Sequence, residues 1–300
     1  MLVSIVTPTY NQGQFIRDTI RSVQNQDYRP LEHIIMDGAS SDNTVSILKQ
    51  YEEDSHNVIV KWVSEKDKGQ ANAVNKGVKQ AQGDIVGWIN SDDVYFSKDI
   101  ISKVVSTFIK HPEIDIIHGD TAIISENGCI LMFWCFPKFD YDKMFFDGKV
   151  SNPTVFFRKE IFEDNLINEN IVAKDFEFWL RIGKNYKFFH LNIIMAGDRD
   201  QLSRISRVFT AGALESHKKV AEEYLPEING FKKVYYFLIS NPERIILRLK
   251  GLIKICLLFA KRNLKETIAF DGWIDSKTGL VFRQLTHRIG VTIWNIKRPQ

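Results

Sequence analysis

Apolar and polar segments alternate regularly along the first hundred residues. Apolar runs typical of buried strands occupy residues 2–10, 31–38, 58–65 and 84–90. Segments with apolar residues at helical spacing lie over 15–26, 41–51, 69–83 and 97–111. Because strands that alternate with helices connect through right-handed crossovers, this pattern predicts a parallel sheet covered by helices.

From residue 114 the pattern changes. Strands are expected at 114–124 and 129–136, joined in a hairpin through Glu126-Asn127-Gly128. Further strands are expected at 150–157 and 187–197, and helices at 174–183, 211–225 and 241–263. The sequence thus predicts an α/β fold with a mostly parallel sheet over residues 1–205, followed by a helical C-terminal extension over 206–300.

Charge distinguishes the extension from the rest of the chain. The net charge is +3, yet residues 231–300 hold 14 Lys and Arg against 4 Asp and Glu. On a helical wheel of 242–262 the basic residues share one face and apolar residues the other. Such a helix either lies in the plane of an anionic membrane surface or packs on the domain with a solvated basic face. Nucleic acid is not an expected partner, because no basic groove with interleaved aromatic residues is visible.

Composition is that of a globular protein, with 44% hydrophobic and 26% charged residues. The three cysteines form no close pair, which argues against disulfides and zinc sites. The N-terminus has no secretory signal pattern, and no apolar stretch reaches the roughly 18 residues of a membrane span. A cytoplasmic location is expected, peripheral on the inner face of the cell membrane if residues 242–262 bind lipid.

Polar residues follow the first four predicted strands, at Thr7–Asn11, Asp37-Gly38, Glu65–Gly69 and Asn90–Asp93. Ligands of parallel α/β sheets bind at the carboxyl ends of the strands, so these residues predict a site. The first turn has neither a GxGxxG pattern nor a Walker lysine loop, so a nucleotide would be held by other means.

Asn90-Ser91-Asp92-Asp93 has two interpretations. The acids could cap a turn, or Asp92 could hold Mg²⁺ or Mn²⁺ together with a diphosphate, since such cations need only one or two carboxylates when phosphates supply the remaining oxygens. The Asn90 amide carries no charge but can still bond a ribose hydroxyl.

Three further positions also have alternatives. Asp37 either forms a turn or accepts a hydrogen bond from a nucleobase. Asp175 either favours the start of its helix or acts as a general base. Trp179, on the same helical face as Asp175, belongs either to the core or to a platform for an acceptor.

Two long segments carry a family resemblance. "SIVTPTYNQGQFIRDTIRSVQNQDYRPLEHIIMDGASSDNT" and "EKDKGQANAVNKGVKQAQGDIVGWINSDD" are similar to the opening blocks of family 2 glycosyltransferases, which have the GT-A fold. The resemblance covers residues 2–205 and is densest up to Asp93. It implies an enzyme that moves a sugar, with inversion, from a UDP-, GDP- or dTDP-sugar to a saccharide or lipid-linked acceptor, in surface or capsular polysaccharide assembly.

The resemblance also assigns roles by position. The nucleotide would be bound by Thr7, Pro8, Tyr10, Asp37, Asn90 and Ser91, with Asp37 at the base and Asn90 at the ribose. Asp92 would hold Mg²⁺ or Mn²⁺ on the diphosphate, and Asp175 would be the general base. Trp179 and Arg199 would lie on the acceptor or phosphate side.

Three residues depart from the family pattern. Asn90 replaces an acid, and Asp200 stands where a histidine is common, leaving Arg199 or Arg204 to supply charge. Lys174 replaces the acid before the base, and its charge should lower the pKa of Asp175. Two rival functions follow: an inactive scaffold that binds a nucleotide-sugar, and a nucleotidyltransferase, although no glycine-rich, arginine-bearing first loop supports the latter.

Overall fold

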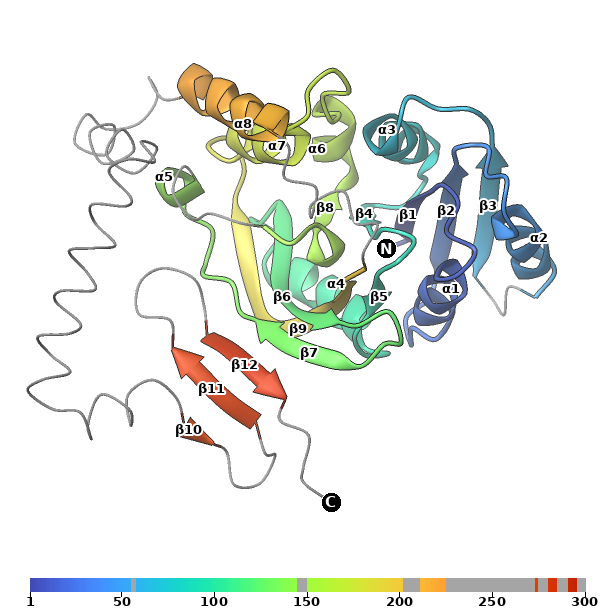
Figure 1. Ribbon diagram of the computed structural model, residues 1–300, viewed down its shortest axis with the longest axis horizontal. Helices are drawn as coiled ribbons and strands as arrows, with labels where there is room; N and C mark the ends of the chain where they lie inside the picture. Colours follow the sequence, from blue (N-terminus) through green and yellow to red (C-terminus); the bar gives the residue numbers. More distant parts are fainter. Residues whose placement is uncertain are drawn as a thin grey trace, which may run out of the picture.

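The computed structural model describes residues 1–54, 58–144, 150–201 and 211–224, together with three strands nearer the C-terminus. Figure 1 shows helices packed on a curved central sheet. The sheet order is β10-β11-β12-β7-β6-β8-β4-β1-β2-β3, with β9 beside β6 and β5 beside β9.

The first four strands are parallel, as predicted. They are β1 (Val3–Thr9), β2 (Leu31–Asp37), β3 (Ile59–Ser64) and β4 (Ile85–Trp88). The helices between and after them are α1 (Ile16–Gln24), α2 (Thr44–Glu53), α3 (Gln70–Gln80) and α4 (Ile100–Lys110). Every residue of β1, β2 and β4 is buried, which explains why these strands are mostly apolar on both faces rather than alternating between apolar and polar residues.

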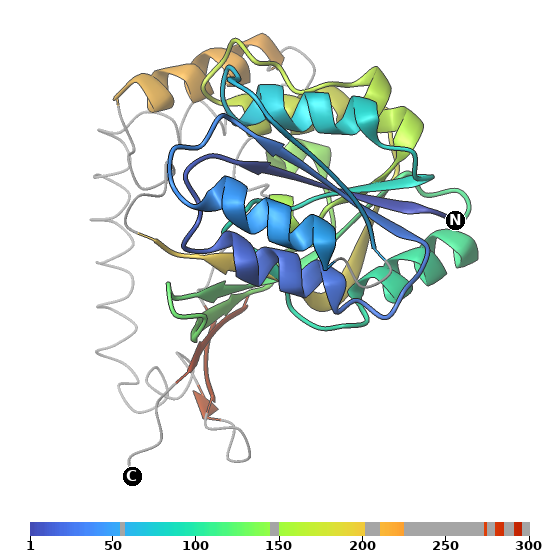
Figure 2. The ribbon, with the colours of Figure 1, turned by 90° about the vertical axis from the view of Figure 1, so that its right-hand side faces the viewer.

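Helices cover both faces of this sheet. Val74 and Val78 of α3 pack with Val6 and Ile34 on one face. On the other face, α1 and α2 pack against Ile35, and α4 packs against β1. Figure 2 shows α3 on one side of the strands with α1 and α2 on the opposite side. The core therefore fixes the strand ends between two rigid layers.

The second half widens the sheet. Its strands are β5 (Val94–Tyr95), β6 (Ile116–Ile124), β7 (Ile130–Trp134), β8 (Phe156–Arg158) and β9 (Phe188–Arg199). Its helices are α5 (Tyr141–Met144), the 3-10 turn η1 (Asn152–Thr154), α6 (Lys159–Asp164), α7 (Lys174–Ile182) and α8 (Ala211–Tyr224). β8 is antiparallel to both β4 and β6, whereas β9 is parallel to β6. The predicted β6–β7 hairpin is confirmed.

Some elements escaped the sequence analysis. The short β5, α5 and α6 were not expected, and residues 150–157 form a 3-10 turn before a three-residue strand. Elements of two to six residues span too few periods to leave a pattern.

The C-terminal part holds strands as well as the expected helix α8. β10 (Trp273–Ile274), β11 (Leu280–Gln284) and β12 (Val291–Asn295) continue the sheet, because β12 pairs antiparallel with β7. The helix expected over 241–263 lies outside the described residues, and the boundary at 205–206 stays a prediction. In the described ranges, no helix has the length and hydropathy needed to cross a membrane.

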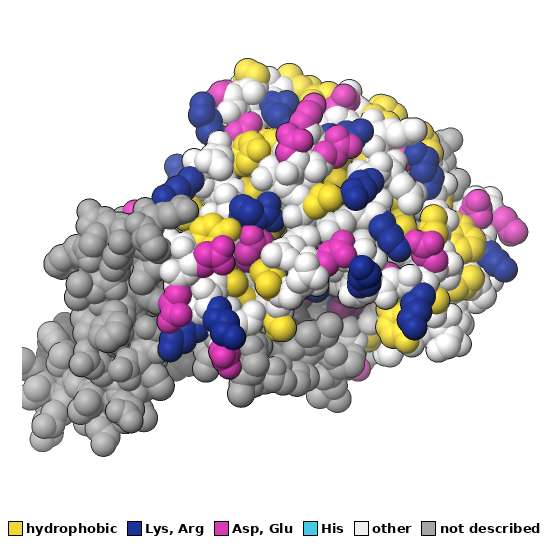
Figure 3. Space-filling model, turned by 90° about the horizontal axis from the view of Figure 1, so that it is seen from above, with side chains coloured by type: hydrophobic (Ala, Val, Ile, Leu, Met, Phe, Trp, Pro, Cys, Tyr) yellow, Lys and Arg dark blue, Asp and Glu magenta, His cyan; other side chains and the backbone are white. Residues whose placement is uncertain are grey.

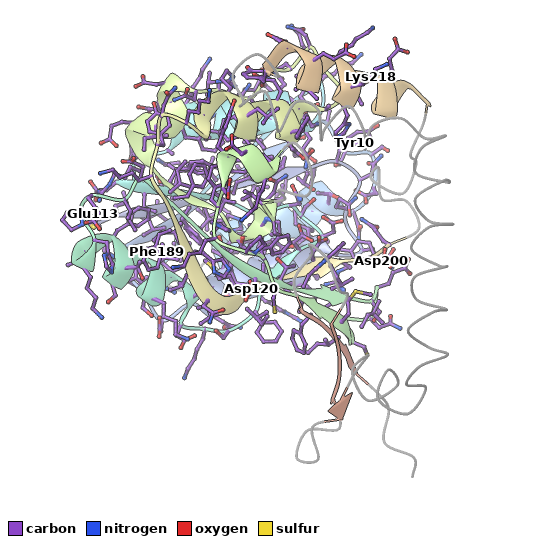
Figure 4. All side chains as sticks on the ribbon, turned by 90° about the vertical axis from the view of Figure 1, so that its left-hand side faces the viewer. Tyr10, Glu113, Asp120, Phe189, Asp200 and Lys218 are labelled. Carbon is purple, nitrogen blue, oxygen red and sulfur yellow. The ribbon has the colours of Figure 1, made fainter. Side chains whose placement is uncertain are left out.

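The chain order places a switch point beside β1. After β1 the chain adds β2 and β3 on one side, then returns through α3 to place β4 on the other. Figure 4 shows Tyr10 and Asp200, which follow β1 and β9, on one side of the molecule, with Glu113 and Phe189 on the opposite side. The first side holds the carboxyl ends of the parallel strands, where a ligand is expected.

Candidate active site

The side chain of Asn90 holds the loop after β4 in place through three hydrogen bonds. Asn90 Oδ1 accepts hydrogen bonds from Gln70 Nε2 (2.7 Å) and Trp88 Nε1 (3.1 Å). Asn90 Nδ2 donates to Asp93 Oδ2 (3.1 Å). Because an indole N–H can only donate, Trp88 fixes the orientation of the amide and directs its NH₂ group toward Asp93.

These hydrogen bonds explain why position 90 carries an amide rather than a carboxylate. A carboxylate at position 90 would place two negative charges in contact and remove the donor that Asp93 requires. The bonds of Asn90 occupy both lone pairs of Oδ1 and one of the two amide hydrogens. Its role as a ribose contact stays a prediction, and the remaining N–H is the group that could serve it.

We expect Asn90→Asp to lower the free energy of unfolding by about 1–3 kcal/mol, the usual consequence of leaving buried polar groups unsatisfied. The loss should shrink at acidic pH, where one carboxyl can bind a proton. Denaturant unfolding of this variant and of Asn90→Asp/Asp93→Asn, which exchanges the two groups, provides the measurement. A double variant no more stable than the single one would contradict the explanation.

The two adjacent acids differ in their surroundings. Asp93 is 2% exposed, its Oδ1 accepts from Arg199 N (3.0 Å), and its backbone carbonyl accepts from Thr19 Oγ1 (2.7 Å). Asp92 is half-buried, and its Oδ2 accepts from Gln201 Nε2 (2.6 Å). Asp93 thus anchors the loop, while Asp92 Oδ1 accepts no hydrogen bond among the described residues. Ser91, between Asn90 and Asp92, is buried.

Arg199, at the end of β9, contacts several loops at the edge of the sheet where the parallel strands end, which we call the rim. It is 1% exposed; its Nε donates to Asp92 O (2.8 Å), its Nη1 to Glu126 O (2.6 Å), and its Nη2 pairs with Asp18 (3.0 Å). Its guanidinium also stacks on Phe15, at 5.0 Å from the ring centre. These contacts join β9 to the Asp92 loop, so Arg199 positions that loop. A direct contact to a phosphate stays a prediction.

Thr7, Pro8 and Tyr10, at the end of β1, differ in how far they are exposed to solvent. Thr7 is fully buried, with Oγ1 bonded to His33 Nε2 (2.9 Å), while His33 Nδ1 bonds the Tyr51 hydroxyl (3.1 Å). Burial lowers the pKa of His33 to about 3, so the ring is neutral and donates one of these bonds. Pro8 is buried, whereas Tyr10 is 60% exposed, and the nucleotide contacts expected of these residues stay predictions.

Asp37 ends β2 and is 2% exposed. Its Oδ2 accepts from Ser40 N (3.0 Å) and Ser64 Oγ (2.6 Å), and its Oδ1 accepts from the Ser40 hydroxyl. Three donors fix the carboxylate at the strand end, beside Thr9 of β1 in the sheet register. This rigid acceptor suits recognition of a base N–H, and that role stays a prediction.

Asp175, the second residue of α7, has a carboxyl oxygen without a hydrogen-bond partner among the described residues. This oxygen, Oδ1, is buried. Burial raises the pKa of Asp175, against the opposing effects of the Lys174 ammonium, the Asn152 side chain and His217. Lys174 acts in the predicted direction and favours the charged carboxylate, but desolvation is the larger effect, so the pKa of Asp175 is raised overall.

Trp179, one turn further along α7, is 3% exposed and lies in the core. Its ring stacks on Phe157 with centres 5.9 Å apart and meets Phe188 edge-on. Its Nε1 is buried without a partner within the described part of the chain. An acceptor could meet only this edge of the indole, so the role on the acceptor side stays a prediction.

Sequence reasoning missed several residues of the rim. Gln70, Gln201 and Asn152 contribute through contacts with Asn90, Asp92 and Asp175, respectively. Polar amides occur throughout the chain, and only the fold shows which of them contact a candidate site residue. Gln70 had the strongest available signal, since it follows Gly69 at the start of a predicted helix after a strand.

These features define the chain as an α/β protein whose parallel strands end in polar side chains on both sides of a topological switch point. The profile named Glycosyl transferase family 2 matches residues 4–162, more than half of the chain. The chain belongs to this family.

Two relatives and one solved structure illustrate the similarity. The chain is 41% identical over 102 residues to TuaG of Bacillus subtilis, a glycosyltransferase assigned to teichuronic acid biosynthesis, covering 34% of this chain and 40% of TuaG. It is 29% identical over 206 residues to the UDP-Glc:alpha-D-GlcNAc-diphosphoundecaprenol beta-1,3-glucosyltransferase WfgD of Escherichia coli, covering 68% and 79%. The chain thus spans less than half of the length of TuaG.

The solved structure is the mannosyltransferase PcManGT of Pyrobaculum calidifontis in complex with GDP-Man and Mn²⁺. It matches with a TM-score of 0.62 at 18% identity, over 89% of this chain and 79% of that one. At this identity the likeness shows a shared GT-A fold.

Proposed function

We propose that this protein is an inverting glycosyltransferase that moves a sugar from a nucleotide-sugar to a hydroxyl group of a saccharide or lipid-linked saccharide. The observation that carries the proposal is the half-buried Asp175 at the start of α7, whose carboxyl has a buried, unpartnered Oδ1 and a raised pKa. Such a group suits a general base that meets its proton donor only when substrate is bound.

We place the nucleotide of the sugar donor at the switch point beside β1. Asp37 and Tyr10 follow neighbouring strands of the sheet, and Asp92 follows β4 on the other side of β1. A rigid carboxylate for a base, an exposed ring and a second carboxylate for a diphosphate together suit a nucleoside diphosphate. WfgD is named for UDP-Glc and PcManGT was solved with GDP-Man, so UDP- and GDP-sugars are the first donors to test, with dTDP-sugars beside them.

The residues at the rim fit a divalent cation held by few protein ligands. Among the described residues no three His, Cys, Asp or Glu side chains form a metal-binding group. Asp92 can supply one ligand, because its Oδ2 accepts from Gln201 while its Oδ1 accepts no hydrogen bond among the described residues. Mg²⁺ and Mn²⁺ accept such a site when a diphosphate supplies the other oxygens. Bound there, the cation would supply Lewis-acid stabilisation of the leaving diphosphate.

The proposed reaction is a single displacement. Asp175 Oδ1 takes the proton from the acceptor hydroxyl while the acceptor oxygen forms a bond to the anomeric carbon. The bond from that carbon to the nucleoside diphosphate breaks, and the diphosphate leaves with the electron pair. Because the acceptor attacks opposite the leaving group, the configuration inverts.

The chemistry of the acceptor follows from the relatives. WfgD is named for a diphosphoundecaprenol-linked sugar, and TuaG for teichuronic acid biosynthesis. We therefore include lipid-linked saccharides among the acceptors. On the face that carries α3, α6, α7 and α8, Figure 3 shows basic and acidic side chains interspersed. The proposed membrane contact is assigned to residues 242–262, which lie outside the described part.

Turnover of a donor panel tests the function. UDP-, GDP- and dTDP-sugars are incubated with the protein and simple glycosides, with Mn²⁺ or with EDTA, and the released nucleotide is identified. We expect a nucleoside diphosphate from one donor class, with release lost in EDTA. Tight binding of donors without release would support the inactive scaffold instead, and release of pyrophosphate from a nucleoside triphosphate and a sugar phosphate would support a nucleotidyltransferase.

A further inference from the structure

The segment between α6 and α7, residues 165–173, leads directly into the helix that carries the proposed base. Asp175 follows this segment by two residues. Ile167, which is 3% exposed, and Ala173 lie in the same core cluster as Val74 of α3. The place of Asp175 in the molecule therefore depends on the contacts that hold these residues, which we call the α6–α7 segment.

The side chain of Asn75 on α3 holds the α6–α7 segment through three hydrogen bonds. Asn75 Oδ1 accepts from Ile167 N (2.9 Å), and Asn75 Nδ2 donates to Ile167 O (2.8 Å), so the amide meets both backbone groups of one residue. Nδ2 also donates to Glu169 Oε1 (2.9 Å). Because Asn75 is only 4% exposed, loss of its side chain would leave buried backbone groups without these partners.

Two further amides of α3 reach the loops of the rim. Asn72 Nδ2 donates to the other oxygen of Glu169 (2.9 Å), and Asn72 Oδ1 accepts from Lys68 N (3.4 Å) in the loop after β3. Gln70 Nε2 donates to Asn90 Oδ1 (2.7 Å) in the loop after β4. One helix thus bonds the loops after β3 and β4 as well as the α6–α7 segment.

α3 packs closely on the sheet. A Cβ atom at Gly77 would lie 2.4 Å from Val6 Cγ1, so the backbone of α3 lies directly against β1. The helix also contacts α6, which precedes the α6–α7 segment (Figure 1). This packing makes α3 a rigid connection between the rim and α7.

Other contacts hold the α6–α7 segment to the helices that follow it. Arg181 Nη2 of α7 donates to Leu166 O (2.8 Å), and Ser216 Oγ of α8 accepts from Ala173 N (3.1 Å). These two bonds fix the segment relative to α7 and α8, but they do not extend to the strand ends where we place the nucleotide. Asn75 provides that link through α3.

We propose that Asn75, together with Glu169, is a positioning residue of the transfer reaction, which holds Asp175 at the correct place relative to the donor at the rim. The inference rests on the proposed transferase function. Both residues act through Asp175, and neither gains a proton or forms a bond during transfer. A general base must lie within hydrogen-bond reach of the proton that it takes, so a small displacement of α7 slows the reaction without changing the binding of the donor.

The first arm of the test is Asn75→Ala. We expect kcat to fall by about 10- to 10²-fold, the usual effect of a displacement of roughly 1 Å. The donor Kd should stay unchanged, because Gln70 still bonds Asn90. Steady-state transfer and a calorimetric titration of the donor provide the measurement, and native kcat in the folded variant would overturn the inference.

The second arm exchanges the two partners and keeps the test decisive where the alanine variant does not fold. Asn75→Asp places a carboxylate against Glu169 and should lower kcat. In Asn75→Asp/Glu169→Gln the donor and the acceptor of this bond change places, while position 75 can still accept from Ile167 N. We expect the double variant to recover about tenfold in kcat over Asn75→Asp. A double variant no faster than the single one would contradict the proposal.

The matched control is Gln26→Ala. Gln26 follows α1, is 4% exposed and, like Asn75, donates two hydrogen bonds and accepts one. Its Nε2 donates to Ser22 O (3.0 Å) and Ser97 O (2.8 Å), and its Oε1 accepts from Ile101 N (3.1 Å). Gln26→Ala should lower thermal stability and retain native kcat. If it lowered kcat as much as Asn75→Ala does, the effect would be a general one of lost bonds, and the positioning role would be wrong.

A double-mutant cycle with the proposed base completes the test. In the Asp175→Asn background, Asn75→Ala should lower the residual transfer by less than about threefold, because the group that it positions no longer acts as a base. Losses that multiply fully would overturn the inference while leaving the transferase function intact. By contrast, absence of transfer in the native protein would count against the proposed function itself.

Discussion

Asp175→Asn is expected to lower kcat by about 10³-fold, within the usual range for loss of a general base. The amide cannot take the proton of the acceptor hydroxyl, yet it has nearly the same shape and should leave donor binding unchanged. The measurement is steady-state transfer together with a separate titration of the donor. The same substitution at exposed Asp164 at the end of α6 is the matched control and should retain native activity.

The pH dependence of the native enzyme tests the same group independently. Asp175 acts as a base only when ionised, and its pKa is raised by burial. Activity should therefore fall with decreasing pH through a pKa above the ordinary aspartate value, and this acidic limb should disappear in Asp175→Asn. Native-like transfer by Asp175→Asn, or an unchanged limb in its residual activity, would exclude Asp175 as the base.

Asp92→Asn is expected to reduce transfer by about 10²–10³-fold, because the carboxylate proposed to hold the cation on the diphosphate is lost. Mn²⁺-dependent binding of nucleoside diphosphate should weaken with it, as measured by calorimetry with and without Mn²⁺. Thermal stability of the apo protein should change little, since the single side-chain bond described for Asp92 comes from Gln201 and an amide oxygen can still accept it.

We expect substitution of Asp93, the neighbouring acid, to affect folding stability rather than Mn²⁺-dependent binding. Asp93→Asn removes an acceptor from a buried carboxylate that bonds Arg199 N and Asn90 Nδ2, so the free energy of unfolding should fall by about 1–3 kcal/mol. If Asp92→Asn left Mn²⁺-dependent binding intact while Asp93→Asn abolished it in a folded protein, the two roles would be reversed.

Much of the fold could be predicted from the sequence, because long buried strands and amphipathic helices leave strong periodic patterns. β1, β2 and α1 lie where the sequence places them. β5 and η1 were missed, although they shape the site, because two or three residues cannot show a period. The pairing of β12 with β7 depends on contacts between distant segments, which the local pattern does not encode.

The candidate site, too, could be predicted from the sequence only in part. Sequence reasoning located the acids after β2 and β4 and at the start of α7, since acids stand out after apolar runs. It assigned the cation to Asp92 through the family resemblance but gave Asp93 no role beyond capping a turn, because only the fold brings Arg199 N to Asp93. It explained Asn90 as a ribose contact, whereas the structure adds a different reason for the amide, the donor that Asp93 requires. Likewise, the net direction of the Asp175 pKa depends on burial, which the neighbouring lysine could not reveal.

The stereochemistry of transfer tests the central claim most directly. With the donor and acceptor identified by the turnover panel, the anomeric configuration of the new linkage is determined by proton NMR of the product. A single displacement assisted by Asp175 predicts a configuration opposite to that of the sugar in the donor. A product with the donor's configuration would contradict the account, because it would require two displacements or attack from the side of the leaving diphosphate.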